Sequence, residues 1–444
     1  MASTYLTRTP SGDGNRKTMT FSFWFKRSIL GSTERIFSTW SNSAANQFWI
    51  RWTSSNELYL VSYTSSSFTT QLITTQLFRD VSAWYHIVIA YDTTQATASN
   101  RIKLYVNGTQ VTTFSTETYP TQNLDTEWNR SSAPNIIGGE PTGGNGEYIS
   151  GSMSHVHFID GTAYDASAFG ETDATTGIWK PKTAPSVTYG TNGFFLKFEN
   201  SGSMGTDSSG NANNFTVNGT MTQTIDTPSN FFATLNPLDN FYCAGTFSNG
   251  NNTIVTGSSE YSYVRGTLGV SQGKWYYEAK AVATSSANTW YSIGWSGNSP
   301  NGTTTPLGNQ SDAVAYQGQN GTIRINTVET STGTTFTTGD IIGTALDLDN
   351  NLVYFYKNGT LVNSGGTSIT ASASTTNGIW CPAVGDFDGT GTKTWSANFG
   401  NGYFGTTPVA SAQNPDDGIG IFEYTVPTGY KALCTKSINA QEYS

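Results

Sequence analysis

Short apolar runs with a period of two residues fill this chain, and no segment carries a long apolar pattern with the 3.6-residue period of a helix. The clearest run covers residues 84–91, and others cover residues 21–25, 274–280 and 352–357. Successive side chains of a strand point to opposite faces of a sheet, so such runs predict strands. The pattern therefore predicts an all-β chain, with one short helical turn near residues 165–169.

Two-residue Asn-Gly turns join several of these runs. Asn107-Gly108 separates residues 102–106 from residues 109–111, and Asn358-Gly359 follows the run 352–357. Both central residues of a type I′ turn need a positive φ, which asparagine and glycine adopt most easily. Each half of the chain is thus expected to contain antiparallel hairpins, and each is long enough for a sandwich of two sheets.

The 444 residues are too many for one ordinary domain. Residues 200–214 are mostly glycine, serine, asparagine and threonine, which is typical of a linker or a surface arm. We predict two antiparallel β-sandwich (jelly-roll) domains in tandem, at residues 1–190 and 236–410. A Gly/Ser/Asn-rich junction at 191–235 joins them, and an irregular tail at 411–444 needs a surface on which to dock.

The composition excludes several classes of protein. Charged residues make up 12% of the chain and aromatic residues 13%, unlike a disordered chain, and the net charge of −9 argues against a nucleic-acid surface. No apolar stretch approaches the ~20 residues of a membrane-spanning helix, and the first residues do not resemble a secretory signal. Cys243, Cys381 and Cys434 are too far apart to suggest a disulfide framework, so we expect reduced thiols in a chain made in a cytoplasm.

Motifs in both halves resemble known sandwich domains. The first half resembles the laminin-G-like, concanavalin A-like jelly roll, and the second half resembles a SPRY domain, which is also an antiparallel sandwich. The first resemblance is carried by residues 21–27, Trp84-Tyr-His-Ile-Val, Leu104-Tyr-Val-Asn-Gly and residues 151–161. The second is carried by Gly273-Lys-Trp-Tyr-Tyr-Glu, Ser292-Ile-Gly-Trp, Gly339-Asp-Ile-Ile-Gly, Ala345-Leu-Asp-Leu-Asp and Val353-Tyr-Phe-Tyr-Lys-Asn-Gly.

The junction between the halves resembles phrases found in bacteriophage virion proteins. The phrases are residues 169–182, residues 189–198, Asp207-Ser-Ser-Gly-Asn-Ala-Asn-Asn-Phe and Phe231-Phe-Ala-Thr-Leu-Asn-Pro-Leu. This resemblance implies that the chain is part of a phage particle, made in the host cytoplasm and in contact with other virion proteins. It does not imply a position in the particle.

Few residues suggest catalysis or metal binding. His155 and His157 are two apart on an expected strand, so their side chains should share a face, but no third ligand lies nearby in sequence. We expect these two, and His86, to have structural roles. Asp347 and Asp349 also share a strand face, but they lead directly into a turn, and we interpret them as turn residues.

Two further acidic segments are candidates, one for a calcium site and one for part of an enzyme active site. Residues 385–391, Gly-Asp-Phe-Asp-Gly-Thr-Gly, offer oxygen ligands for calcium, although a plain Asp-Gly turn is the simpler interpretation. We expect no other cofactor. Glu171-Thr-Asp173 begins the Glu-x-Asp-x-x-Glu strand of concanavalin-like glucanases but lacks its last glutamate. The sequence therefore predicts no enzyme.

The aromatic surplus favours carbohydrate binding at exposed rings, because a flat ring packs well against a sugar face. Most aromatic side chains must be core residues in sandwiches of this size. The candidates for exposed ligand-binding rings are Trp40, Trp52, Trp128 and Trp295, with Asp125 and Asn129 beside Trp128 in an expected loop.

These observations lead to a binding function carried by loops on rigid sandwiches. The first hypothesis is a tail fibre or surface-exposed adhesin that binds host-surface glycans or proteins without transforming them. It acts as a homo-oligomer, for which a trimer is one form, so that many copies strengthen attachment. The second hypothesis is an architectural head-decoration or tail-associated subunit. A third, a glycan depolymerase, would need two facing carboxylates in a cleft.

Overall fold

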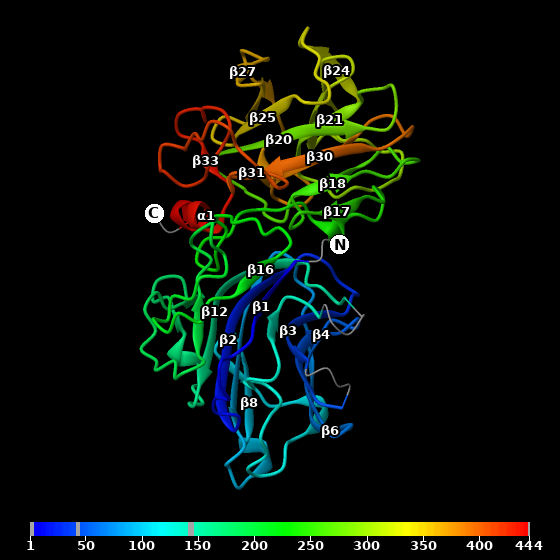
Figure 1. Cartoon of the computed structure of the whole chain (residues 1–444). Coiled ribbons are helices and arrows are strands. Elements are labelled where there is room, and N and C mark those ends of the chain that lie inside the picture. The colour runs from blue at the N-terminus through cyan, green and yellow to red at the C-terminus, as the bar shows by residue number, and fades with distance from the viewer. Residues whose placement is uncertain (1–3, 41–44, 141–145, 443–444) are drawn as a thin grey trace. The chain divides into compact units, whose positions relative to one another are not determined.

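The computed structural model describes residues 4–40, 45–140 and 146–442 (Figure 1), and the side chains of Trp40 and Glu442 are outside this description. The chain divides into two compact units, residues 1–223 and 224–444. Among the described strands, every named pair is antiparallel except the short pairing of β33 (Lys431–Ala432) with β20 (Lys274–Thr284). The prediction of an all-β chain with two sandwich units is confirmed, and no described helix is long and apolar enough to cross a membrane.

The first unit consists of an eight-stranded and a six-stranded sheet. In spatial order the larger sheet is β10 (Phe114–Thr118), β6 (Ser67–Leu77), β5 (Glu57–Thr64), β4 (Gln47–Trp52), β3 (Glu34–Trp40), β11 (Asn135–Ile137), β1 (Tyr5–Arg8) and β16 (Thr216–Asn218). The smaller sheet is β15 (Phe194–Leu196), β12 (Gly151–Asp160), β2 (Thr18–Arg27), β7 (Trp84–Asp92), β8 (Ile102–Val106) and β9 (Thr109–Val111). Short elements are η1 (Ala98–Asn100), η2 (Ala166–Ala168), β13 (Gly170–Thr172) and β14 (Trp179–Pro181). The turn expected near 165–169 is thus η2.

The core of the first unit lies between these sheets, where alternate residues of β2 and β7 face those of β4 and β5. Phe21, Phe23 and Phe25 of β2 are fully buried, as the period-two pattern requires. The other face of β2 is also buried, because residues 161–190 fold over it: Phe169 packs with Val88 and Ile159, and Trp179 lies against the same cluster. This central strand therefore reads as an almost continuous buried run.

The second unit also pairs two sheets. Its nine-stranded sheet contains β17 (Thr246–Ser248), β18 (Thr253–Val255), β30 (Lys393–Asn398), β20, β25 (Ile341–Asp347), β26 (Leu352–Lys357), β27 (Thr360–Leu361), β28 (Thr367–Ser368) and β33. The six-stranded sheet is β19 (Tyr263–Arg265), β29 (Cys381–Asp386), β21 (Tyr291–Ser296), β22 (Ala313–Gln317), β23 (Thr322–Ile325) and β24 (Val328–Ser331). Short elements are η3 (Pro237–Asp239), η4 (Ser372–Ser374), β31 (Tyr403–Phe404), β32 (Thr407–Pro408) and α1 (Thr435–Glu442).

The expected junction at 191–235 differs in the structure. Its first part belongs to the first unit, because β15 joins the smaller sheet and β16 pairs with β1 in the larger one. Asp207 fixes the glycine- and asparagine-rich loop by accepting hydrogen bonds from the backbone N–H groups of Phe195 and Asn213, each at 2.8 Å. A composition typical of a linker therefore forms a packed loop here, because the Asp207 side chain accepts hydrogen bonds from backbone groups on both sides of it, including one on strand β15.

The expected tail at 411–444 is part of the second unit. Phe422, Leu433 and Cys434 are fully buried in its core. The carboxylate of Glu278 on β20 accepts the backbone N–H groups of Glu423 at 2.9 Å and Tyr424 at 3.0 Å. The surface on which this tail docks is thus its own domain.

Candidate functional site

The tryptophans proposed as exposed ligand-binding rings are core residues. Trp52, Trp128 and Trp295 are each 0% exposed, so the prediction that their rings face a ligand is wrong. Sequence position suggested a loop for Trp128, and the loop exists, but the ring turns inward and packs on Phe21 and Phe158 with centroids 5.2 and 5.8 Å away. Trp40 ends strand β3, and its side chain lies outside the described part of the chain.

The two polar candidates beside Trp128, Asp125 and Asn129, differ in exposure. Asp125 is exposed, as expected of a loop residue. Asn129 is fully buried, and its side chain donates to the Asn15 carbonyl at 3.0 Å and to Asp160 Oδ1 at 2.8 Å. Its Oδ1 accepts from Asn192 Nδ2 at 2.8 Å. Asn129 therefore joins distant loops of the first unit and has no free group for a ligand.

The three histidines have structural partners. Trp179 Nε1 donates to His86 Nδ1 at 2.9 Å, and the Trp24 ring stacks on the His86 ring at 4.6 Å. The strand pairing shifts register between Ser154 and His157, and His155 has a φ of 47°, so the period-two argument for the pair 155/157 does not apply. Within the described residues, no group of three or more His, Cys, Asp or Glu side chains could hold a metal ion.

Acidic candidates from the sequence are also engaged within the protein. Asp347 Oδ1 accepts the backbone N–H of Asp349 at 3.1 Å, and its Oδ2 lies 3.1 Å from Lys274 Nζ, which supports the turn interpretation. In the segment 385–391, Asp388 Oδ2 lies 3.2 Å from the ammonium of Lys393, whose side chain is 0% exposed. The Lys393 ammonium thus pairs with Asp388, one of the carboxylates that the calcium alternative would need, and the segment forms the turn that was the simpler interpretation.

All three cysteines are buried and free. Burial raises the pKa of Cys243 to about 12 and that of Cys381 to about 11, and it also raises the pKa of Cys434. Because the thiolate is the nucleophile, the native chain should react with a disulfide-exchange reagent such as DTNB far more slowly than a free thiol at neutral pH. We expect all three thiols to react after denaturation in guanidinium. Fast labelling of any cysteine in the native chain would contradict this.

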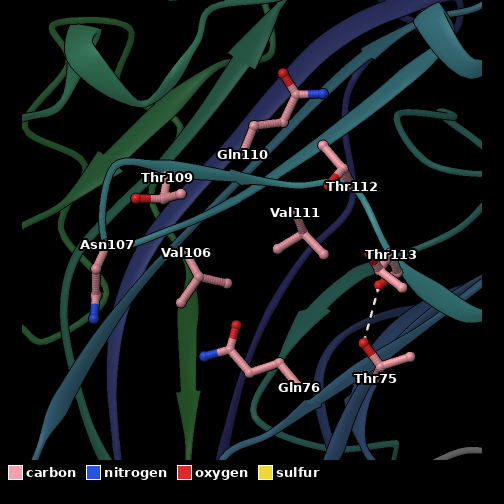
Figure 2. Close-up of a pocket in the computed structure, with 9 residues that line it drawn as sticks. All are labelled: Thr75, Gln76, Val106, Asn107, Thr109, Gln110, Val111, Thr112 and Thr113. Carbon is pink, nitrogen blue, oxygen red and sulfur yellow. Dashed lines mark hydrogen bonds between the residues drawn. The ribbon is translucent and has the colours of Figure 1, made fainter.

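A surface groove of about 360 Å³ lies in the first unit, where the outer edges of its two sheets approach (Figure 2). Strand β9 is the edge of the smaller sheet, and β10, the edge of the larger sheet, pairs with β6. The groove is lined by the end of β6, the Asn-Gly turn, β9 and the link to β10. Its nine lining residues are Thr75, Gln76, Val106, Asn107, Thr109, Gln110, Val111, Thr112 and Thr113.

The lining of this groove is polar but uncharged. Val106 is 7% exposed and Val111 is half-buried, and Figure 2 shows them between Asn107 and Thr113. Thr75 Oγ1 donates to the Thr113 carbonyl at 3.3 Å and links the two sheet edges. Amides and hydroxyls both donate and accept hydrogen bonds, whereas none of the nine side chains is a carboxylate, imidazole or thiol. The groove can therefore hold a neutral polar ligand, but its lining offers no acid–base group and no base that would activate its threonine hydroxyls as nucleophiles.

One segment of the sequence, the Asn-Gly turn and the residues after it, forms much of this groove, but its pattern predicts only a hairpin. Asn107-Gly108 forms the hairpin turn, and the uncharged residues after it are the edge strand β9 (Thr109–Val111) and the link Thr112-Thr113. Thr75 and Gln76 of β6 are more than 30 residues away in the chain and belong to the other sheet, so only the packing of the two sheets brings them to the same groove as β9.

The comparisons with known proteins agree with the fold. Residues 2–167 match the family model of the concanavalin A-like lectin/glucanases superfamily, and residues 274–385 match that of the SPRY domain. The chain thus carries a concanavalin A-like, laminin G-like domain followed by a SPRY domain, and both suggest binding roles. No curated protein matches the chain significantly.

Three solved structures illustrate the similarity. The SPRY domain of human HERC1 is 20% identical over 35% of this chain and 91% of that chain, with a TM-score of 0.28. The heptameric SAP-like pentraxin from Limulus polyphemus is 20% identical over 36% of this chain and 71% of that chain, also with a TM-score of 0.28. The TRIM65 PSpry domain is 15% identical over 37% of this chain and 91% of that chain, with a TM-score of 0.27.

Proposed function

We propose that this chain, a concanavalin A-like domain followed by a SPRY domain, is a non-enzymatic binding protein that recognises neutral glycans on a host cell surface through the groove at β9. The observation that carries the proposal is the lining of that groove: amides, hydroxyls and two valines on a rigid sheet edge, with no charged side chain. Such a surface forms hydrogen bonds to ligand hydroxyls and leaves the ligand chemically unchanged.

The position we propose for this binding protein is the surface of a phage particle, as a tail fibre or adhesin. The support is the resemblance of the junction phrases, such as Asp207-Ser-Ser-Gly-Asn-Ala-Asn-Asn-Phe, to phage virion proteins. A shallow groove without an aromatic platform holds a single glycan weakly, so attachment would depend on several copies of the chain acting together. Assembly as a homo-oligomer with other virion proteins would provide them.

The proposal is tested with a variant in which a large side chain fills the groove. Thr109 is exposed on β9 and lines the groove, so Thr109→Trp should fill it and lower binding to an immobilised glycan array about tenfold or more. Thr216→Trp is the matched control, because Thr216 is exposed on β16, the other edge of the larger sheet. Equal binding by both variants would show that the groove is not the glycan site, and cleavage of any bound glycan would refute a non-enzymatic role.

An architectural role is the second candidate, favoured by one observation on the second unit. Phe241 is 85% exposed and Leu238 62% exposed in and beside η3, and large apolar side chains exposed together are typical of protein contacts. Electron microscopy of intact particles separates the two roles. A subunit at the tail tip supports the adhesin, whereas a subunit enclosed within the shell or tail supports the architectural role.

A further inference from the structure

We infer that the groove at β9 selects 2-acetamido sugars over sugars that carry only hydroxyls, an inference that rests on the proposed function and names its ligand class. An acetamido group presents a carbonyl acceptor, an N–H donor and a methyl group, and the groove offers a complementary group for each of the three.

Asn107 supplies the donor for the ligand carbonyl. It stands in the left-handed region with a φ of 47°, which the Asn-Gly turn fixes. The backbone N–H of His86 donates to Asn107 Oδ1 at 2.8 Å, so the orientation of this side-chain amide is set. Its Nδ2 has no hydrogen-bond partner within the described part of the chain. Asn107, which lines the groove, therefore has a side-chain N–H donor that no described residue uses, while its carbonyl already accepts one hydrogen bond.

Val106 and Val111 supply the contact for the methyl group. Their side chains lie together in the groove, with the Gln76 side chain drawn below them (Figure 2). A sugar that carries only hydroxyls places water-binding groups against such a surface, which leaves those groups without partners. An acetamido methyl group, by contrast, gains from leaving water there.

Thr75 and Gln76 supply acceptors for the ligand N–H. The Thr75 hydroxyl uses its hydrogen on the Thr113 carbonyl and keeps lone pairs that accept. The Gln76 amide is exposed, and its Oε1 has no partner among the described residues. Donor, acceptor and apolar contact thus lie along one groove.

The groove also lacks the features that would favour other sugars. None of its nine residues is basic, so an acidic sugar would find no opposite charge there, and none is aromatic, so no ring is available to stack on a hexose face. Selection must therefore come from the substituents of the sugar, and the acetamido group has a carbonyl, an N–H and a methyl group that each find a partner in the groove.

Isothermal titration of the full chain with chitobiose (the N-acetylglucosamine disaccharide) and with cellobiose tests this. We expect chitobiose to bind about tenfold more tightly or better. Asn107→Asp keeps the acceptor for His86 N–H and tolerates the positive φ, but it replaces the donor by a carboxylate oxygen that repels the ligand carbonyl. It should lower chitobiose affinity about tenfold.

Asn326→Asp is the matched control, because Asn326 is exposed at a left-handed turn position in the second unit, with a φ of 49°. It should leave chitobiose affinity unchanged. Equal affinity for both disaccharides, or full chitobiose affinity in Asn107→Asp, overturns this inference and leaves the proposed function standing if Thr109→Trp still lowers glycan binding. Failure of the chain to bind any glycan on the array overturns both.

Discussion

Replacing Trp128 by alanine should destabilise the first unit by about 3–5 kcal/mol, the usual cost of removing a large buried ring. The Trp128 side chain is 0% exposed and contacts four phenylalanine rings of both sheets. Those rings are Phe21, Phe37, Phe48 and Phe158, at centroid distances of 5.2, 5.9, 5.7 and 5.8 Å. The cavity left by the ring would lie between the two sheets, at the centre of their aromatic packing. The surrounding strands would fill this cavity only in part, and the cost follows from what stays empty.

Two variants make this expectation specific. Trp128→Phe keeps a ring, and the indole Nε1 has no hydrogen-bond partner in the described structure, so the loss should be clearly smaller than for alanine. Asp125→Ala, three residues away and exposed, should change stability by less than about 0.5 kcal/mol. Urea unfolding of the full chain, followed by tryptophan fluorescence, measures all three. A Trp128→Ala chain with native stability but lost glycan binding would restore Trp128 as a binding residue.

Acidification should destabilise the first unit, because all three histidines of the chain lie there, with His86 and His157 buried and His155 half-buried. Burial lowers the pKa of His86 to about 3 and that of His155 to about 4, and it holds the pKa of His157 well below its ordinary value. Proximity of the histidines to one another adds to the shifts of His86 and His157, and Lys197 adds to that of His155.

The direction of the stability change on acidification follows from the unfolded chain, in which a histidine has a pKa of about 6.5. As the pH falls below that value the unfolded chain binds protons that the folded unit does not, so folding stability is lost. Each histidine should cost about 1–2 kcal/mol between about pH 7 and about pH 5. Glu34 acts in the opposite direction, because burial raises its pKa to about 7 despite Arg27 beside it. The net loss should be roughly 2–4 kcal/mol.

The second unit should respond in the opposite way. It has no histidine, and burial raises the pKa of Glu278 to about 7 and that of Asp386 to about 6. A carboxyl group with a raised folded pKa contributes stability that is present at low pH and is lost as the pH rises through that pKa. The second unit should therefore be more stable at about pH 5 than at about pH 7.5.

Calorimetry of the full chain across this pH range should thus show one melting transition moving down and one moving up on acidification. His157→Gln removes one titrating group, so it should make the downward shift of the first transition shallower. Val328→Thr, a substitution on the exposed strand β24, should leave both slopes unchanged. Two transitions that move together would show that burial of these groups does not control the pH response.

The sequence by itself determined the strands and hairpins, because their signals are local. The period-two run at residues 84–91 became β7, and Asn107-Gly108 became the turn between β8 and β9, since side-chain alternation and positive φ depend only on neighbouring residues. The same reasoning failed for Trp128. A loop position is visible in sequence, but the direction of a side chain within a loop depends on what packs against it.

Tertiary structure alone decided where polar groups meet. Packing of the larger sheet, which contains β6, against the smaller sheet, which contains β8 and β9, places Gln76 in one groove with Val106 and Asn107, and no local pattern contains that contact. Tertiary contacts also make residues 200–214 a loop held by Asp207 where a linker was expected, and they place Leu433 and Cys434 in the core of the second unit. Burial and long-range hydrogen bonds are properties of the assembled sheets, whereas the alternation that builds those sheets is a property of each strand.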